Sequence, residues 1–296
     1  MANTVNTIPT TKLNDGTEIP ILGYGTGTAW YKISKDDEIN RDLVETAKSA
    51  VKLGYRHLDG AEVYRTEQDL GQAIQESGLP RERLFVTTKV KDNIVDIPAA
   101  IDASLEKLQL DHVDLYLIHA PFFATTEGEL QAAWAAMEKV KEAGKARSIG
   151  VSNFVQSHLE TILKTAKVIP VVNQIEFHPY LQHEKLVPFQ ESKGIKTVGY
   201  AGLVPITRAS GGPLDPLLSA LATKYAVSES EILLRWTLDR GCIAITTSSK
   251  ESRLASYLRV LAFKLTPQEV DDISQLGEQQ HYRAFWRARF AADDRS

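Results

Sequence analysis

The chain has 296 residues, of which 43% are hydrophobic and 24% charged, and its formal net charge is −4. The length suits a single (β/α)8 barrel, which needs roughly 250 residues plus insertions, and we expect residues 1–296 to form one domain. The charge gives no broad reason to bind nucleic acid or an anionic membrane, and no apolar run reaches the roughly 18 residues of a membrane helix.

The first predicted element is a β-hairpin at residues 11–19, where two short runs flank the turn sequence Asn14-Asp15-Gly16. Eight apolar runs follow that are rich in Val, Ile, Leu and Tyr. They lack clean polar alternation, which is typical of parallel strands buried on both faces. These predicted strands lie at residues 21–25, 57–60, 84–89, 113–119, 146–151, 171–176, 197–200 and 243–247.

Amphipathic stretches of helical period alternate with these strands. We assign to the repeat the predicted helices at residues 41–53, 66–76, 98–108, 129–143, 156–166, 184–192, 216–225 and 251–258. Stretches 230–238 and 267–276 are predicted as extra helices toward the C-terminus. Eight strand-helix units predict an α/β fold of the (β/α)8 TIM barrel class, with an N-terminal hairpin and extra C-terminal helices.

The alternative fold is a doubly wound open sheet, which usually carries Gly-x-Gly-x-x-Gly between its first strand and first helix. Here the glycines at 23, 25 and 27 give Gly-x-Gly-x-Gly, and no helix pattern follows directly. The dinucleotide motif is therefore absent at this point. A flexible strand end, where backbone approaches a ligand closely, explains these glycines better.

Ionisable residues follow three neighbouring predicted strands, at the barrel end where active sites lie. Asp59, Lys89 and His119 close strands two, three and four, and Tyr64 follows Asp59 by five residues. Singly, each is explained as a helix cap, a solvated lysine or a core histidine. Their joint occurrence favours a shared site.

These four residue types suit carbonyl reduction, which adds a hydride to carbon and a proton to oxygen. A tyrosine has a pKa near ~10. A nearby ammonium, here Lys89, is expected to lower that pKa toward the operating pH, with Asp59 holding the lysine charged. His119 would hydrogen-bond the carbonyl oxygen. The histidines show no zinc-ligand spacing, and we predict no metal.

Four sequence blocks together resemble the aldo-keto reductase family along nearly the whole chain. They are Gly54-Tyr55-Arg56-His57-Leu58-Asp59 with Tyr64, Asp114-Leu115-Tyr116-Leu117-Ile118-His119, Ile149-Gly150-Val151-Ser152-Asn153-Phe154 and Val172-Asn173-Gln174-Ile175-Glu176-Phe177-His178-Pro179. The resemblance implies a catalytic tetrad of Tyr64, Lys89, Asp59 and His119. It implies a nicotinamide site whose carboxamide contacts Ser152, Asn153 and Gln174 and whose ring stacks on Tyr200. Gly27 and Thr28 are further predicted cofactor contacts.

Two segments depart from the pattern of many relatives. Tyr200-Ala201-Gly202-Leu203-Val204-Pro205 replaces Tyr-Ser-Pro-Leu-Gly, and after strand eight Thr247 stands where a phosphate-binding lysine is common. The second departure leaves NADH open as cofactor. A phosphate needs charge and donors, and the candidates that supply them are Thr247, Ser248, Ser249, Lys250 and Arg253. The Thr-Thr-Ser-Ser-Lys run also resembles the NADPH-dependent fungal branch that reduces α-keto amides and conjugated polyketones, so we predict NADPH.

Aromatic residues near the predicted site could form an apolar substrate pocket; they are Trp30, Tyr31, Phe122, Phe123 and Trp286. The C-terminal tail (residues 277–296) is expected near this pocket, although its aromatics could instead pack it on the barrel. The branch resemblance implies 1,2-dicarbonyl substrates: α-keto amides and esters, conjugated polyketones and ketopantoyl lactone.

Three other functions stay open at this point. They are a general aldose or aldehyde reductase, a non-catalytic NADP(H)-binding regulatory subunit, and a barrel hydrolase or isomerase that uses Asp59, Glu62 and His119. The single cysteine, Cys242, excludes an intrachain disulfide, and with the polar N-terminal stretch it predicts a cytoplasmic protein. The resemblance further implies a monomer.

Overall fold

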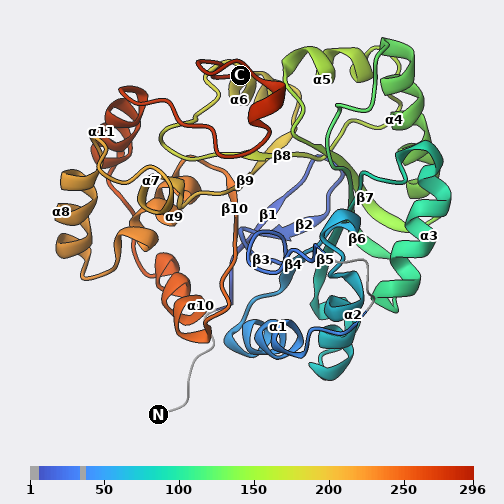
Figure 1. The fold of residues 1–296 in the computed structure, drawn as a ribbon, viewed down its shortest axis with the longest axis horizontal. Coiled ribbons are helices and arrows are strands. Elements are labelled where there is room, and N and C mark those ends of the chain that lie inside the picture. The colour runs from blue at the N-terminus through green and yellow to red at the C-terminus, as the bar shows by residue number, and fades with distance from the viewer. Residues whose placement is uncertain (1–6, 34–37) are drawn as a thin grey trace.

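Eight parallel strands close into a barrel in the computed structural model, which describes residues 7–33 and 38–296 (Figure 1). The first six residues of the polar N-terminal stretch lie outside the described residues. Around the barrel the strands follow the order β10-β3-β4-β5-β6-β7-β8-β9. Their bounds are β3 Leu22–Gly25, β4 His57–Asp59, β5 Phe85–Val90, β6 Val113–Ile118, β7 Ala146–Ser152, β8 Val172–Glu176, β9 Lys196–Tyr200 and β10 Ile243–Thr246. The predicted barrel is confirmed, and each strand end lies within one residue of its predicted position.

Helices cover the outside of the barrel (Figure 1). The first helix, α1, shows how the sequence sets its ends. The Asn40 side chain accepts a hydrogen bond from the N–H of Leu43 at the N-terminus, and Gly54, with a φ of 116°, ends the helix. Its apolar residues are buried against the barrel side. The bounds are α1 Arg41–Leu53, α2 Glu67–Glu76, α3 Ile97–Leu108, α4 Glu127–Glu142, α5 Gln156–Leu163, α6 Leu186–Ser192, α7 Val204–Thr207, α8 Asp215–Tyr225, α9 Glu229–Asp239, α10 Glu251–Tyr257 and α11 Pro267–Glu278.

The helix that belongs to the repeat between β9 and β10 was predicted wrongly. The sequence assigned it to 216–225, but α9 is the helix that packs against β10, and all of its residues from Glu231 to Leu238 are buried. Helix α8 packs on α9 and buries only Leu218 and Leu221. Helical period alone does not tell which of two consecutive helices contacts the barrel. The short α7 was not predicted, because a single turn shows no periodicity.

The N-terminal hairpin, β1 (Thr10–Lys12) paired with β2 (Glu18–Pro20), is confirmed. Its Leu13 and Ile19 are buried in one cluster with Phe85, Val171 and Ile243, which lie at or beside the starts of β5, β8 and β10. The hairpin therefore closes the N-terminal end of the barrel, and the C-terminal strand ends remain for a site. Within the described residues, every helix is too short or too polar to cross a membrane.

Candidate active site

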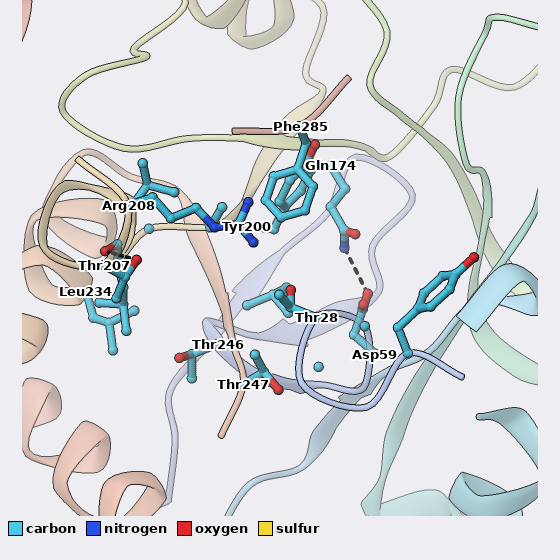
Figure 2. Close-up of a pocket in the computed structure, with 18 of the residues that line it drawn as sticks. Thr28, Asp59, Gln174, Tyr200, Thr207, Arg208, Leu234, Thr246, Thr247 and Phe285 are labelled. Carbon is cyan, nitrogen blue, oxygen red and sulfur yellow. Dashed lines mark hydrogen bonds between the residues drawn. The ribbon is translucent and has the colours of Figure 1, made fainter. Parts of the chain in front are cut away.

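A cavity of about 1010 Å³ lies at the C-terminal ends of the strands. It is lined by residues at or near the ends of all eight strands: Gly25, Asp59, Lys91, His119, Ser152, Gln174, Tyr200 and Thr246. Figure 2 shows side chains from several of these strands around one space, with Thr207, Arg208 and Leu234 on one side and Asp59 on another. The cavity is thus at the end of the barrel where the sequence predicts the active site.

A buried ion pair lies at the floor of this site. The Lys89 side chain has no exposed surface, and its Nζ donates hydrogen bonds to Asp59 Oδ1 at 2.6 Å and to the Gly60 carbonyl oxygen at 2.7 Å. The other Asp59 oxygen, Oδ2, accepts a hydrogen bond from Gln174 Nε2 at 2.8 Å, the dashed line in Figure 2. Burial lowers the pKa of Lys89, and the negative charge of Asp59 acts in the opposite direction.

Tyr64 ends a 3-10 turn, Glu62–Tyr64, that follows β4. Its hydroxyl lies 3.3 Å from His119 Nε2, and Lys89 Nζ lies 5.1 Å from its ring centroid. The structure thus brings Asp59, Tyr64, Lys89 and His119 together. Gly27 contacts the same phenol: a Cβ there would stand 3.0 Å from Tyr64 Cζ, so this position needs a small residue.

The expected direction of the Tyr64 pKa shift is wrong. Burial raises the pKa of the phenol well above its usual value, and the negative charge of Asp59 adds to the rise. The Lys89 ammonium alone would lower this pKa, but the ring also loses its surrounding water, and the Asp59 carboxylate lies 2.6 Å from that ammonium. The phenol therefore keeps its proton throughout the neutral pH range, which is the state that a proton donor needs.

His119, directly after β6, is neutral at physiological pH. Burial lowers its pKa well below the usual value, and the charges of Lys89 and Lys91 lower it further. Its Nδ1 is buried without a hydrogen-bond partner. A neutral imidazole carries one N–H donor and one acceptor, so His119 can hydrogen-bond a neutral carbonyl without adding a charge.

A hydrogen-bonded group of polar side chains continues the cavity wall. Ser152 Oγ donates to the Gln174 carbonyl oxygen at 2.7 Å, Asn153 Nδ2 donates to Ser152 Oγ at 3.0 Å, and the Tyr200 hydroxyl donates to Asn153 Oδ1 at 2.7 Å. All four residues line the cavity. An aromatic ring beside amide groups fits the planar, amide-bearing ring of a nicotinamide.

The predicted phosphate-binding residues divide into two groups. Thr247 and Arg253 line the cavity, as does Thr28, and the Thr247 hydroxyl is buried without a hydrogen-bond partner. Ser248 Oγ instead accepts a hydrogen bond from the N–H of Lys250 at 3.0 Å. Ser249 and Lys250 are exposed outside the cavity lining. A guanidinium and a free hydroxyl are both groups that can donate hydrogen bonds to a phosphate oxygen.

The predicted substrate-pocket aromatics also divide. Tyr31 and Trp286 line the cavity, with ring centroids 6.3 Å from Tyr64 and 6.4 Å from His119 respectively. Phe122 lies behind Trp286, at a centroid distance of 5.0 Å, and does not line the cavity. Trp30 and Phe123 pack against the hydrophobic core rather than on the cavity wall.

Several lining residues were not predicted. Leu203, Val204, Thr207 and Arg208 come from the segment around α7. Phe285, one of the tail aromatics that the sequence offered as a possible pocket wall, also lines the cavity. The Arg208 guanidinium lies 4.8 Å from the centroid of the Phe285 ring (Figure 2). This segment is the one whose sequence departs from relatives, so no motif marked it; only the position directly after a strand end could have drawn attention to it.

Comparisons with known proteins show what the chain is similar to. The model of the "Aldo/keto reductase family" matches residues 22–278. The chain is 43% identical to the NAD/NADP-dependent indole-3-acetaldehyde reductase of Schizosaccharomyces pombe, over 92% of this chain and 96% of that one. It is 40% identical to the NADPH-dependent alpha-keto amide reductase of Saccharomyces cerevisiae, over 93% of each. The crystal structure of a Bombyx mori aldo-keto reductase in complex with NADP has a TM-score of 0.80 at 38% identity, covering 91% of this chain and 93% of that one.

Proposed function

Because the chain belongs to the aldo/keto reductase family and is thereby an oxidoreductase that acts on carbonyl groups, we propose that it reduces ketones or aldehydes with NADPH. Tyr64 acts as proton donor in this proposal, with Lys89, Asp59 and His119 as the other catalytic residues. The observation that carries it is the position of the Tyr64 hydroxyl at the cavity wall, 3.3 Å from His119 Nε2, with the buried Lys89 Nζ 5.1 Å from the tyrosine ring centroid.

When bound, NADPH supplies the hydride that the carbonyl carbon accepts. His119 and Tyr64 hydrogen-bond the carbonyl oxygen, so negative charge that develops there meets two donors. Tyr64 then donates its proton. An alkoxide is far more basic than a phenolate, so this transfer is favourable even from a phenol of raised pKa. The Lys89 ammonium stabilises the phenolate left behind, and Asp59 keeps that ammonium charged although the lysine side chain is buried.

The residues present support a dinucleotide that spans the cavity. Ser152, Asn153 and Gln174 offer amide and hydroxyl groups for a carboxamide, and Tyr200 offers a ring face. Toward the other end, the unpartnered Thr247 hydroxyl and the Arg253 guanidinium suit a phosphate. We assign this pair to the 2′-phosphate of the adenosine ribose, which NADPH carries and NADH lacks, so the pair supports NADPH over NADH.

Replacing Arg253 by Ala should raise the KM for NADPH about tenfold or more and leave the KM for NADH nearly unchanged. The reason is the loss of a hydrogen bond to a charged group, worth about 1.5–3 kcal/mol. Steady-state kinetics with both cofactors measures the effect. Lys250→Ala is the matched comparison, because Lys250 is exposed outside the cavity. If Lys250→Ala carries the NADPH-specific effect instead, or if both KM values rise equally, the Arg253 assignment is refuted.

Within carbonyl substrates we propose 1,2-dicarbonyls, such as α-keto amides, α-keto esters, conjugated polyketones and ketopantoyl lactone. A second carbonyl makes the reacting carbon more electrophilic. Support comes from the similarity to an alpha-keto amide reductase and from the flat aromatic rings of Tyr31 and Trp286 beside the proposed proton donor.

A substrate panel tests both levels of this proposal. We expect kcat/KM with NADPH to be at least about tenfold higher for a vicinal diketone or an α-keto amide than for an alkyl aldehyde of equal size, which corresponds to about 1.4 kcal/mol at the transition state. Indole-3-acetaldehyde belongs in the panel because of the fission-yeast relative. A preference for simple aldehydes would refute the dicarbonyl class. Absence of NAD(P)H oxidation with every compound would refute the reductase itself.

Location and assembly are part of the proposal. Cys242 is a buried free thiol, which supports a reducing, cytoplasmic environment. The monomeric state stays a prediction that the family resemblance supports.

A further inference from the structure

Glu176, the last residue of β8, carries a buried carboxylate outside the cavity lining and outside the proposed tetrad. Both of its oxygens are used. Oε1 accepts from the backbone N–H of Ala284 at 2.7 Å and lies 3.0 Å from His178 Nε2, and Oε2 accepts from the N–H of Phe285 at 2.9 Å. Two consecutive amides of the C-terminal tail therefore bind one barrel carboxylate.

The carboxylate is ionised at neutral pH. Burial pushes the pKa of Glu176 upward, but the hydrogen bond from His178 and those from the N–H groups of Ala284 and Phe285 outweigh it, and the pKa is lowered. Hydrogen bonds to a charged acceptor are stronger than neutral ones. The two N–H groups stabilise the buried carboxylate, which would be costly without such donors. The carboxylate in turn holds the backbone of the tail at Ala284 and Phe285.

The residues fixed by these bonds form part of the cavity wall. The Phe285 ring stands edge-on to Tyr200 at a centroid distance of 5.5 Å (Figure 2), and the next residue is Trp286, 6.4 Å from the His119 ring. Trp286 has a φ of +59°. A bulky residue keeps this left-handed conformation only where surrounding contacts hold it, and the two bonded amides directly precede it. In Figure 1 the tail, in red, runs along the rim of the barrel near β8.

We propose that Glu176 is a positioning residue that holds the C-terminal tail over the cavity and so determines which carbonyl substrates fit. This inference rests on the proposed reductase function. Glu176 touches none of the proposed catalytic groups; it acts through Phe285 and Trp286, whose rings narrow the space beside Tyr200 and His119. A substrate large enough to contact both rings needs the tail to be held in place by Glu176. A small substrate reaches Tyr64 whether or not the tail is held.

The first test is Glu176→Gln. The amide keeps the size but presents an NH₂ group to one of the two N–H donors, so one tail bond is lost. We expect amide hydrogen exchange at residues 284–286 to accelerate about tenfold, the equivalent of one hydrogen bond to a charged group. The KM for an aryl vicinal diketone should rise by a similar factor, while kcat for 2,3-butanedione changes less than about threefold.

A second variant leaves the barrel untouched, in case the buried substitution prevents folding. Ala284→Pro removes one N–H donor, because proline has none. It should produce the same loss of protection at residues 285 and 286 and the same rise in KM for the aryl diketone. Ala291→Pro, at an exposed tail position whose N–H does not bind Glu176, is the matched control and should produce neither.

Combining Glu176→Gln with Ala284→Pro should add little to either single effect, since both break one interaction. Unchanged exchange in Ala284→Pro, or equal kinetic losses for small and aryl substrates, would overturn the inference. The exchange measurement requires no turnover. If the protein reduces no carbonyl but the variants show the predicted change in hydrogen exchange, the proposed function is refuted and the role of Glu176 in holding the tail is not.

Discussion

Replacing Tyr64 by Phe should lower kcat for carbonyl reduction by about 10³-fold, within the range that general acid catalysis contributes. The variant keeps the ring and removes the only hydroxyl within hydrogen-bond distance of His119 Nε2 among the described residues. The developing alkoxide then has no proton donor of its own. Cofactor affinity should not change, because the substitution leaves Ser152, Asn153, Gln174 and Tyr200 in place.

The measurement is kcat by NADPH absorbance together with the Kd for NADPH by fluorescence titration. Tyr31→Phe is the matched control, since that ring lines the same cavity 6.3 Å from Tyr64 and lacks a proposed role in proton transfer. It should retain most of its activity. A Tyr64→Phe variant that keeps more than about a tenth of the wild-type kcat contradicts the assignment of the proton donor.

Replacing Lys89 by Met should both destabilise the fold, by about 3–5 kcal/mol, and lower kcat at least about 10²-fold. Methionine fills the space of the lysine stem but leaves the Asp59 carboxylate buried with Gln174 Nε2 as its remaining side-chain donor. Without the ammonium, a phenolate at Tyr64 loses the positive charge that lies 5.1 Å from its ring centroid. Urea unfolding measures the first effect and steady-state kinetics the second.

The double variant Asp59→Asn with Lys89→Met separates the two effects. It removes both charges, so we expect it to regain part of the lost stability and none of the lost activity. A Lys89→Met protein as stable as the wild type would refute the account of the ion pair. Recovery of activity in the double variant would show that the ammonium has no role in catalysis.

Much of the fold could be predicted because its signals are local. Buried parallel strands appear as apolar runs, and helix ends are marked by residues such as Asn40 and Gly54. Which of two successive helices contacts the barrel is a tertiary question, and the sequence assigned 216–225 where α9 is correct. The same holds for α7, whose single turn follows β9 without any periodic signal.

For the site, residues on strands were easier to predict than residues on loops. Asp59 and Gln174 could be placed because a strand end fixes direction and neighbours. Phe122 could not be placed: it follows β6 closely, yet its ring packs on Trp286 and Phe290 of the tail and does not line the cavity. The direction of the Tyr64 pKa shift depends on how much water the ring loses, which no motif encodes.

The hydrogen bond from Gln174 to Asp59 joins β8 to β4, strands that stand diametrically opposite in the order of the barrel. Together with the ion pair between Asp59 and Lys89 on β5, it forms a hydrogen-bonded network across the C-terminal end of the barrel. All three residues of this network lie on strands. The aromatic rings of the proposed substrate pocket, Tyr31 and Trp286, belong instead to a loop and to the C-terminal tail. In such a molecule the substrate range can change through substitutions in the loop and the tail, while the hydrogen-bonded network on the strands preserves the chemistry.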